Sequence, residues 1–417
     1  MSPFNKHLHN IHGEISVKKS DRQMYTEIFD EIVQTIVEKM HQVDGVFKSL
    51  NKGQELFGSY SNGVRIRSPS EFDVYLVLKF PYPIDVLRDK SRPGFVHLHM
   101  SKAKEEAWSY CNTPLYNVLK NIVDYNNGLL RRTNFKNWMF DVIETAVERC
   151  RVRFRNNGYD VSSERHAVAY NVYVRDLNNP DIKISIDMVP AIEFGPCNWI
   201  QIRSYGVVKP SHFCNFMAVA KKSSYKPKNT FAHTFMMVNS RSERDILLNR
   251  QHLKPALRLL KSLRDKYEMN RLKSFFITNV FLWQVQIQPL DFWKKPLGDV
   301  FLYMLYKLRD GFEKGELKYF WFEEFNLLDI LKPKEIREYS KTLNQIYGTM
   351  RSYLHQPNLS YNRVASYFDL PESEYDSESE YDSEPVYYDS DDYYDYDEEL
   401  SSGSDYDEDD FDFGTYY

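Results

Sequence analysis

The stretch Phe57-Gly58-Ser59-Tyr60, followed by Ser68-Pro69-Ser70-Glu71-Phe72-Asp73-Val74, decides how this chain is interpreted. Gly58 and Ser59 predict a tight turn whose backbone N–H groups and hydroxyl can hold phosphates. Glu71 and Asp73 stand two positions apart in a β-type run, so both point to the same side of a strand. Phosphoryl transfer needs such carboxylates, since two metal ions about 4 Å apart neutralise the triphosphate and activate the attacking hydroxyl.

A third carboxylate is expected from the apolar segment Ile184-Ser185-Ile186-Asp187-Met188. Alternation turns the three aliphatic side chains towards the core and leaves Asp187 on the opposite side. Two acids at this spacing are common on solvated strands, but the nearby Gly-Ser turn and a lone Asp in an apolar strand are more specific. We therefore predict that Glu71, Asp73 and Asp187 form a catalytic site that binds two Mg²⁺ or Mn²⁺ ions.

The surrounding sequence predicts an α+β fold in two lobes. Ser20-Asp21-Arg22-Gln23 reads as a capping box before a long amphipathic helix over about 21–42, which we expect to pack on a sheet. Strands are expected at 72–78, 167–174 and 182–189, and helices at 134–150, 241–267, 272–288, 297–309 and 334–354. Four arginines alternate over 149–155, which fits either a strand or the end of the preceding helix.

These elements suggest four segments. Residues 1–19 are expected to be a flexible terminus, in which His7, His9 and His12 either bind a metal or are simply solvated. Residues 20–205 form the catalytic lobe and 206–365 a helical lobe. Residues 366–417 are Asp, Glu, Ser and Tyr with almost no aliphatics, so we expect a disordered acidic tail.

The net charge of −5 conceals two opposite parts. Residues 369–417 contain 21 of the 59 acidic residues and no Lys or Arg, so residues 1–368 carry 54 bases against 38 acids. That excess of positive charge favours a polyanionic partner such as nucleic acid. The tail either competes with that partner for the basic surface or only improves solubility.

Cysteine usage and hydropathy bear on the compartment. The four cysteines, Cys111, Cys150, Cys197 and Cys214, show no C-x-x-C spacing, which argues against a disulfide scaffold or a four-Cys zinc site. No leader-like segment and no apolar run of membrane-spanning length occurs in the sequence. We expect a cytosolic protein that does not contact membranes.

The motifs quoted above resemble the catalytic core of the cyclic GMP–AMP synthase-like receptors, innate-immune members of the nucleotidyltransferase superfamily. The resemblance runs from the helix at about 21 to the helices near 355. It implies a bilobed nucleotidyltransferase fold with a long spine helix on a mixed sheet. It further implies that ATP and GTP are joined into a cyclic dinucleotide once a ligand, often double-stranded nucleic acid, activates the enzyme, and it allows a homodimer on that ligand.

The resemblance also implies nucleotide contacts. These fall on Gly58, Ser59, Met236, Ser240, Glu243, Lys261, Ser274 and Phe275. Ser240 to Glu243 also reads as a capping box, Lys261 as part of a solvated basic stripe, and Phe275 as a core residue. Met236 and Val238 stand where the family has an Arg and a Ser that read guanine, which leaves nucleotide choice open.

A second departure concerns zinc and the activating ligand. The vertebrate DNA sensor of the family has a His-and-Cys zinc insertion after its lid, and residues 249–255 offer His252 without any Cys. We therefore expect no structural zinc, and double-stranded RNA rather than DNA as activator, as in insect-type relatives. RNA duplexes are read through phosphates and 2′-hydroxyls, which requires a basic surface. The candidates, which are equally ordinary surface charges, are Lys18, Lys19, Arg22, Arg131, Arg132, Lys221 and Lys222.

Two other functions remain open on the sequence. An RNA-activated enzyme that makes linear oligonucleotides would need the same three carboxylates. A catalytically inactive scaffold of the same fold would bind nucleic acid without turnover. The presence of all three acids argues against the scaffold, whereas the altered lid leaves room for it.

Overall fold

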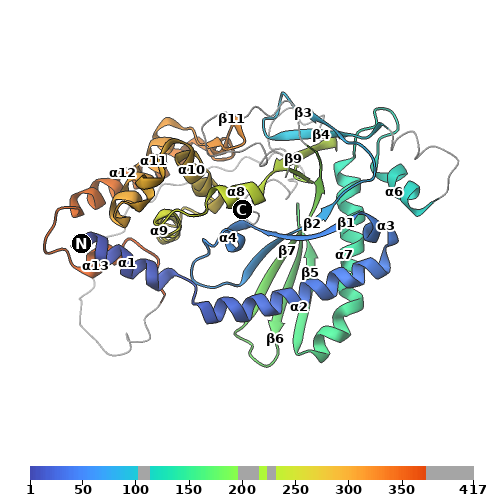
Figure 1. Cartoon of the computed structure of the whole chain (residues 1–417), viewed down its shortest axis with the longest axis horizontal. Coiled ribbons are helices and arrows are strands. Elements are labelled where there is room, and N and C mark those ends of the chain that lie inside the picture. Colours follow the sequence, from blue (N-terminus) through green and yellow to red (C-terminus); the bar gives the residue numbers. More distant parts are fainter. Residues whose placement is uncertain (102–112, 196–215, 223–231, 372–417) are drawn as a thin grey trace, which may run out of the picture.

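A computed structural model describes residues 1–101, 113–195, 216–222 and 232–371 of the chain. Two lobes lie side by side in Figure 1, one built on a β-sheet and one built of helices. The disordered acidic tail is expected over 366–417, but its first residues, 366–371, are placed, and Phe368 is buried against Phe301. The rest of the tail, from residue 372 onwards, lies outside the described residues, as do Cys111, Cys197 and Cys214.

A nine-stranded mixed sheet organises the catalytic lobe. β2 and β7 pair in parallel, whereas every other described pair in this sheet is antiparallel. The strands run in the order β1-β2-β7-β8-β9-β4-β3. Along the edge of β7 that does not face β2, β6 pairs with the first half of β7 and β8 with its end. β5 pairs with β6. Their bounds are β1 Asn51–Phe57, β2 Glu71–Leu78, β3 Asp85–Arg88, β4 Phe95–His99, β5 Tyr159–Arg165, β6 Tyr170–Asp176, β7 Lys183–Glu193, β8 Met217–Val219 and β9 Thr234–Val238.

Two long helices, α2 (Lys19–Val43) and α7 (Arg132–Asn156), pack against each other and cover one face of this sheet. Phe29 of α2 stacks on Phe72 of β2 with ring centroids 4.5 Å apart. The predicted spine helix and α+β fold are confirmed. The expected capping box is wrong, because α2 begins at Lys19 and Ser20 donates to Asp21 instead. The arginine-rich segment 149–155 is the end of α7, so helix is the correct alternative.

The N-terminal residues are helical and not a flexible terminus as predicted. α1 (Pro3–Ile15) buries Phe4, Leu8 and Ile11 completely against the helical lobe. Asn5 Oδ1 accepts a hydrogen bond from Gly298 N at 2.9 Å, and the Phe4 ring lies edge-on to Tyr353. The apolar side chains at helical spacing supply the burial that stabilises this terminus. The chain therefore starts in the helical lobe and crosses to the catalytic lobe at residues 16–18.

The sheet extends further along the chain than the predicted lobe division at 205. β8 and β9 belong to it, so the helical lobe begins after β9. The expected helix over 241–267 is two helices, α8 (Ser240–Ile246) and α9 (Leu253–Lys266). The helical lobe continues with α10 Ser274–Ile287, η3 Leu290–Lys294, α11 Leu297–Lys314, β10 Lys318–Tyr319, β11 Phe322–Asn326, η4 Leu327–Ile330, α12 Pro333–Tyr353 and α13 Tyr361–Ala365. Short helices α3 (Gly45–Leu50), α4 (Gly58–Ser61) and α6 (Pro114–Ile122) complete the catalytic lobe.

Across the described residues, no helix combines the length and the apolar character that crossing a bilayer requires.

The docking of α1 is testable. Replacing Phe4 with Ala removes a fully buried ring, and we expect the free energy of unfolding to fall by about 3–5 kcal/mol. Urea denaturation followed by circular dichroism measures this change. Asn10→Ala, on the exposed side of the same helix, serves as the control and should leave the midpoint nearly unchanged. Equal midpoints for both variants would mean that α1 is not docked in solution.

Candidate active site

The parallel pairing of β2 with β7 brings the predicted carboxylates together. Asp73 lies directly opposite Asp187, and Glu71 lies opposite Ser185. Since side chains two residues apart share a face, all three acids project from the same side of the sheet. The other side carries Phe72 and Ile186, which are buried in the core. The strand register thus gathers acids from two distant segments on one polar face.

Asp73 and Asp187 are both buried, with 9% and 5% of their surface exposed. Burial, and then the negative charges of Asp187 and Glu71, raise the pKa of the Asp73 carboxyl well above its ordinary value. Buried acids that repel one another cost folding free energy unless a proton or a cation neutralises them. The site therefore favours positively charged ligands.

Glu71 lies at the open edge of this group. Arg65 Nη1 donates to Glu71 Oε2 at 2.5 Å, and the Glu71 side chain is 63% exposed. Partial burial acts to raise the pKa of Glu71, but the hydrogen bond and charge of Arg65, helped by Lys261 and Arg264, outweigh it and hold the pKa below its ordinary value. Glu71 is thus an ionised carboxylate held by an arginine in this conformation.

The donor set matches divalent metals, because Mg²⁺ and Mn²⁺ prefer carboxylate oxygens. The mutual repulsion at Asp73 is an observation of this structure that fits a cation between the acids. Within the described part of the chain, however, no three His, Cys, Asp or Glu side chains converge closely enough to hold one ion. Glu71 accounts for this, since it turns to Arg65. The acids suit the metal chemically, and Glu71 is held by Arg65 in this conformation.

The predicted Gly58-Ser59 turn lies against this carboxylate pair. Phe57 at the end of β1 is paired with Asp73, so α4 begins beside the Asp73 side chain. Gly58 has φ +73°, and a Cβ there would lie 2.9 Å from Asp73 Cγ and closer still to Oδ2. Only glycine satisfies both the left-handed backbone and this close approach. The half-buried Ser59 follows at the start of the same turn.

The predicted lid residues Ser240 to Glu243 form the first turn of α8, directly after β9. Asn239, not Ser240, caps α8, since its side chain accepts from Ser242 N. Ser240 Oγ donates to Tyr75 Oη at 3.2 Å, and Tyr75 stacks on Phe57 with centroids 3.7 Å apart. The lid serine is therefore connected, through the ring of Tyr75, to Phe57, the residue that precedes Gly58.

Glu243, the other predicted lid contact, is buried on the helical-lobe side. Trp321 Nε1 donates to Glu243 Oε1 at 2.9 Å, and only 2% of Glu243 is exposed. Burial raises the pKa of Glu243 to about 8, although the Trp321 hydrogen bond acts to lower it. The carboxyl is therefore largely protonated at neutral pH.

Helix α9 is hydrogen-bonded to the loop that leads into β2. Lys261 Nζ donates to the Val64 carbonyl at 3.1 Å, and Arg258 Nη2 donates to the Gly63 carbonyl at 2.7 Å. Lys261 is 3% exposed, and burial, followed by the charges of Arg264 and Arg65, lowers its pKa to about 7. The predicted solvated stripe does not describe Lys261, which is a buried residue facing the interface between the lobes.

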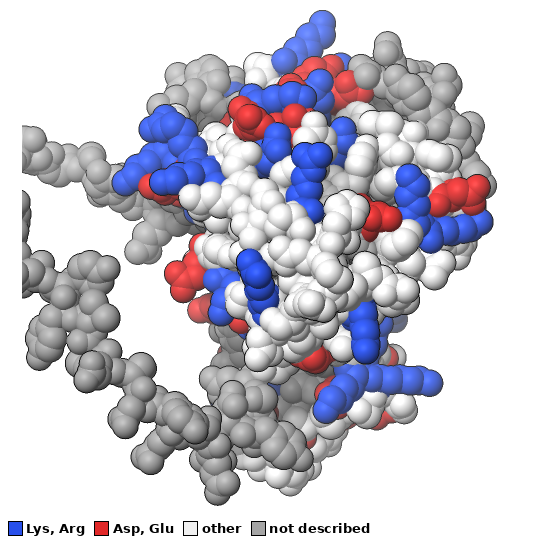
Figure 2. Space-filling model, turned by 90° about the vertical axis from the view of Figure 1, so that its left-hand side faces the viewer, with Lys and Arg blue, Asp and Glu red and all other residues white. Residues whose placement is uncertain are grey.

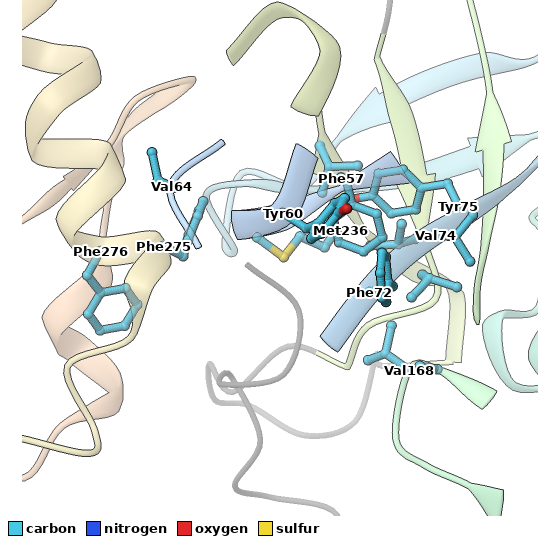
Figure 3. Close-up of a cluster of buried hydrophobic side chains, with 14 of the residues drawn as sticks. Phe57, Tyr60, Val64, Phe72, Val74, Tyr75, Val168, Met236, Phe275 and Phe276 are labelled. Atoms are coloured by element: carbon cyan, nitrogen blue, oxygen red, sulfur yellow. The ribbon is translucent and has the colours of Figure 1, made fainter. Parts of the chain in front are cut away.

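Three further predicted nucleotide contacts, Met236, Ser274 and Phe275, are buried or bonded within the protein. Figure 3 shows Met236 near Phe57 and Tyr60, whereas Phe275 lies across on the helical lobe. Met236 and Phe275 are 0% and 1% exposed, so neither offers a surface to a nucleotide here. Ser274 Oγ accepts from Arg264 Nη1 at 2.8 Å. Contacts from these residues remain predictions about a nucleotide-bound form.

The candidate nucleic-acid residues differ in how exposed they are. Lys18, Lys19 and Arg22 are exposed at the start of α2, whereas Lys221 is only 6% exposed and unavailable to an outside ligand. The remaining candidates, Lys222 and the partly buried pair Arg131 and Arg132 before and in α7, lie apart from α2 along the chain. On the side of the helical lobe, Figure 2 shows Lys and Arg interspersed with Asp and Glu around a wide uncharged area. Among these candidates, the residues at the start of α2 are therefore the most exposed.

The N-terminal histidines serve packing in this structure. His7 Nε2 bonds the Leu359 carbonyl at 2.8 Å, and His12 Nε2 lies 2.9 Å from Arg258 Nη1. Burial, and then the charge of Arg258, lower the pKa of His12 to about 4. His9 lies edge-on to His252, but the described residues contain no set of three such ligands for a metal.

Sequence reasoning missed the residues that position the predicted ones. Arg65, Tyr75 and Trp321 each hold one of them through the hydrogen bonds described above. Arg65 stands six positions before Glu71, and in a loop this spacing does not predict a contact. Trp321 is 78 residues from Glu243. Only tertiary structure reveals these pairs.

The fold and the paired carboxylates beside a glycine turn define a nucleotidyltransferase. Residues 60–249 match the Mab-21 protein nucleotidyltransferase domain, and residues 252–345 match the Mab-21 protein HhH/H2TH-like domain. The chain therefore belongs to the Mab-21 nucleotidyltransferase family. The change of family domain at about residue 250 agrees with a helical lobe that starts after β9.

Individual relatives cover most of the chain. Cyclic GMP-AMP synthase-like receptor 1 of Drosophila simulans is 31% identical over 321 residues, which are 72% of this chain and 76% of that protein. The protein of the same name from Drosophila melanogaster is 30% identical over 323 residues, 73% and 80% of the two chains. A cyclic GMP-AMP synthase-like receptor of Drosophila eugracilis is 27% identical over 350 residues, 82% and 90%. The resemblance inferred from the motifs is confirmed.

Gly58→Ala tests the geometry of the turn. The new Cβ would push Asp73 out of register with Asp187, and the left-handed backbone adds a cost of about 1–2 kcal/mol. We expect a lower midpoint in thermal unfolding and a loss of nucleotide turnover of at least about tenfold. Gly45→Ala is the matched control, because a Cβ there meets nothing within 4 Å. A Gly58→Ala protein as stable and active as the control would contradict this geometry.

Glu243→Gln tests the buried carboxyl through pH. Unfolded Glu243 ionises above about pH 4.5, whereas the folded group stays protonated up to about pH 8, so native stability falls as the pH rises between these values. Gln removes that loss, and we expect the variant to gain on the order of 1–3 kcal/mol over the wild type at pH 8 and almost nothing at pH 5. Chemical denaturation at both pH values measures the gain. The exposed substitution Glu338→Gln should show no such pH dependence, and a Glu243→Gln gain equal at both pH values would refute a raised pKa.

Proposed function

We propose that this chain is a metal-dependent nucleotidyltransferase that joins ATP and GTP into a cyclic dinucleotide of the cyclic GMP–AMP type. The observation that carries the proposal is the register that sets Asp73 opposite Asp187, with Glu71 on the same face and Gly58 against Asp73. The names of the relatives support the product class. In this proposal the enzyme acts in the cytosol as an innate-immune sensor that double-stranded RNA activates.

The chain's own residues account for binding and orientation. Glu71, Asp73 and Asp187 would hold two Mg²⁺ or Mn²⁺ ions, which when bound would neutralise the triphosphate and lower the pKa of the attacking hydroxyl. The N–H groups of the turn at Gly58 and Ser59 would contact the phosphates. Lys261 faces the interface between the lobes and would donate to the triphosphate after releasing the Val64 carbonyl. A triphosphate would also favour its protonated form, given a pKa of about 7.

The structure suggests what activation must change. Two of the proposed ligand-binding groups are engaged within the protein, Glu71 with Arg65 and Lys261 with the loop carbonyl. Both contacts involve residues 64 and 65, so one movement of this loop would release both groups. RNA bound at Lys18, Lys19 and Arg22 would act at the start of α2, and Arg22 already contacts Tyr60 of the Gly58 turn through a hydrogen bond to its carbonyl and a cation–π contact. A homodimer formed on the RNA is compatible with this arrangement.

The decisive experiment incubates the full chain with ATP, GTP and Mg²⁺ or Mn²⁺, with RNA duplex, DNA duplex or neither, and separates the products by chromatography. We expect a cyclic dinucleotide that depends on metal and RNA. Linear oligomers would instead identify an oligonucleotide synthase, and RNA binding without turnover a scaffold.

Asp187→Asn should abolish turnover, with a loss of at least about 10³-fold, because it removes one charge from the metal site and keeps the side-chain shape. Its thermal midpoint should be equal to or higher than that of the wild type, since one repelling charge is gone. Asp299→Asn, an exposed acid on α11, is the control and should retain turnover. Substantial activity in Asp187→Asn would remove the metal mechanism.

A further inference from the structure

A second depression lies on the same polar face, beyond Glu71. We call it the β5–β7 groove; it has a volume of about 380 Å³, and its polar lining includes Glu71, Ser162, Tyr173, Arg175, Lys183 and Ser185. This volume lies within the range of about 300–1,000 Å³ of small-molecule sites. The strands that form it extend past α2 at the lower edge of Figure 1. The proposed transfer reaction makes no use of this groove apart from Glu71.

Strand register shows how the groove relates to the carboxylates. Asp187 pairs with Asn171 of β6, Ser185 with Tyr173, and Lys183 with Arg175. Because the pairs alternate by two residues, all of these side chains project from the face that carries Asp73. Four residues separate Lys183 from Asp187, which is about 13 Å along the strand. The two cations are therefore carried at the far end of the strands from Asp187.

Tyr173 is held with its ring at the groove. Its hydroxyl donates to Glu164 Oε1 at 2.6 Å and accepts from Asn171 Nδ2 at 3.3 Å. These bonds, to groups on two strands, orient the ring, and 38% of the residue is nevertheless exposed. An aromatic ring held in this way at a polar surface is suited to stacking on a planar group such as a nucleobase.

The cations of the groove are available, whereas its acids are partly neutralised. Arg175 and Lys183 are exposed neighbours across the β6–β7 pair, and within the described residues neither takes part in an ion pair with Asp or Glu. Glu71 is engaged by Arg65, and Asp160 lies 3.9 Å from the guanidinium of Arg155. Asp160 lies opposite Arg175 in the β5–β6 register, but two adjacent cations that form no ion pair among the described residues, with serine hydroxyls nearby, favour a phosphate group.

We propose that the β5–β7 groove binds a nucleoside phosphate in addition to the two reacting nucleotides, with its phosphate at Arg175 and Lys183 and its base on Tyr173. This inference rests on the proposed function, since it adds a nucleotide subsite beside the transfer centre. Because Glu71 lines the groove, a nucleotide bound there would contact the carboxylate that Arg65 holds. The ring would hold the base by stacking, and the two cations would hold the phosphate, so both are needed to fix the nucleotide at its two ends.

The test is isothermal titration calorimetry of the full chain with AMP in the presence of EDTA. We expect Arg175→Ala/Lys183→Ala to weaken AMP binding at least about tenfold, Tyr173→Ala to weaken it about fivefold or more, and Tyr173→Phe to stay within about twofold. Asp187→Asn should bind AMP as the wild type does, because the groove does not include that residue. Arg337→Ala/Lys341→Ala removes the same charge from a groove on α12 and controls for general attraction.

Each result decides the proposal. Wild-type affinity in Arg175→Ala/Lys183→Ala, or an equal loss in Arg337→Ala/Lys341→Ala, would overturn it. Inorganic phosphate that binds as tightly as AMP, together with an unaffected Tyr173→Ala, would also overturn it as a nucleoside site. Turnover is measured separately: AMP binding that needs Arg175 and Lys183 in a chain without turnover would support the groove and refute the enzyme.

Discussion

The parallel pairing of β2 with β7 is the constraint on which the rest of this structure depends. It places Asp73 opposite Asp187 in a buried position, where the two carboxyls repel each other. The opposite faces of the same strands carry Phe72 and Ile186 into the core, so the repulsion cannot relax by rotating a strand without exposing apolar surface. The fold thus keeps together two charges that would otherwise separate, which is the arrangement a cation-binding site needs.

The loop that leads into β2 connects this site to the helical lobe. Residues 62–67 receive hydrogen bonds from Lys261 and Arg258 of α9, and Arg67 N donates to the Ile15 carbonyl at the end of α1. Arg67, in a left-handed conformation with φ 61°, also forms an ion pair with Asp369, and the Asp369 backbone bonds Ser262. Segments from both ends of the described chain therefore meet at the loop that leads into Glu71. Residues that pack at α1 and after α13 therefore contact the loop that carries Arg65, the partner of Glu71.

The polar face of the sheet is larger than the transfer centre. Register carries it from Asp73 across Asp187 and Asn171 to Glu164, and then along the strands to Lys183 and Arg175. Acidic groups gather near Gly58 and the two cations lie farther out. A face whose charge changes from negative to positive in this way suits a ligand that has metal ions at one end and a phosphate at the other.

Local patterns in the sequence determined the acids, the glycine turn and the spine helix. Alternation fixed which side of a strand Glu71, Asp73 and Asp187 take, and apolar spacing fixed α2, because both depend only on neighbouring residues. Tertiary structure decided the contacts between distant residues, namely Arg65 with Glu71 and Trp321 with Glu243. It also decided the docking of α1, because its few apolar residues stand in a polar segment and become a core only when the helical lobe buries them. The short strands β8 and β9 were missed for the same reason, since their stability comes from pairing within the sheet. Lys261 likewise reads as surface charge in sequence, and only the approach of α9 to the loop carbonyl at Val64 buries it.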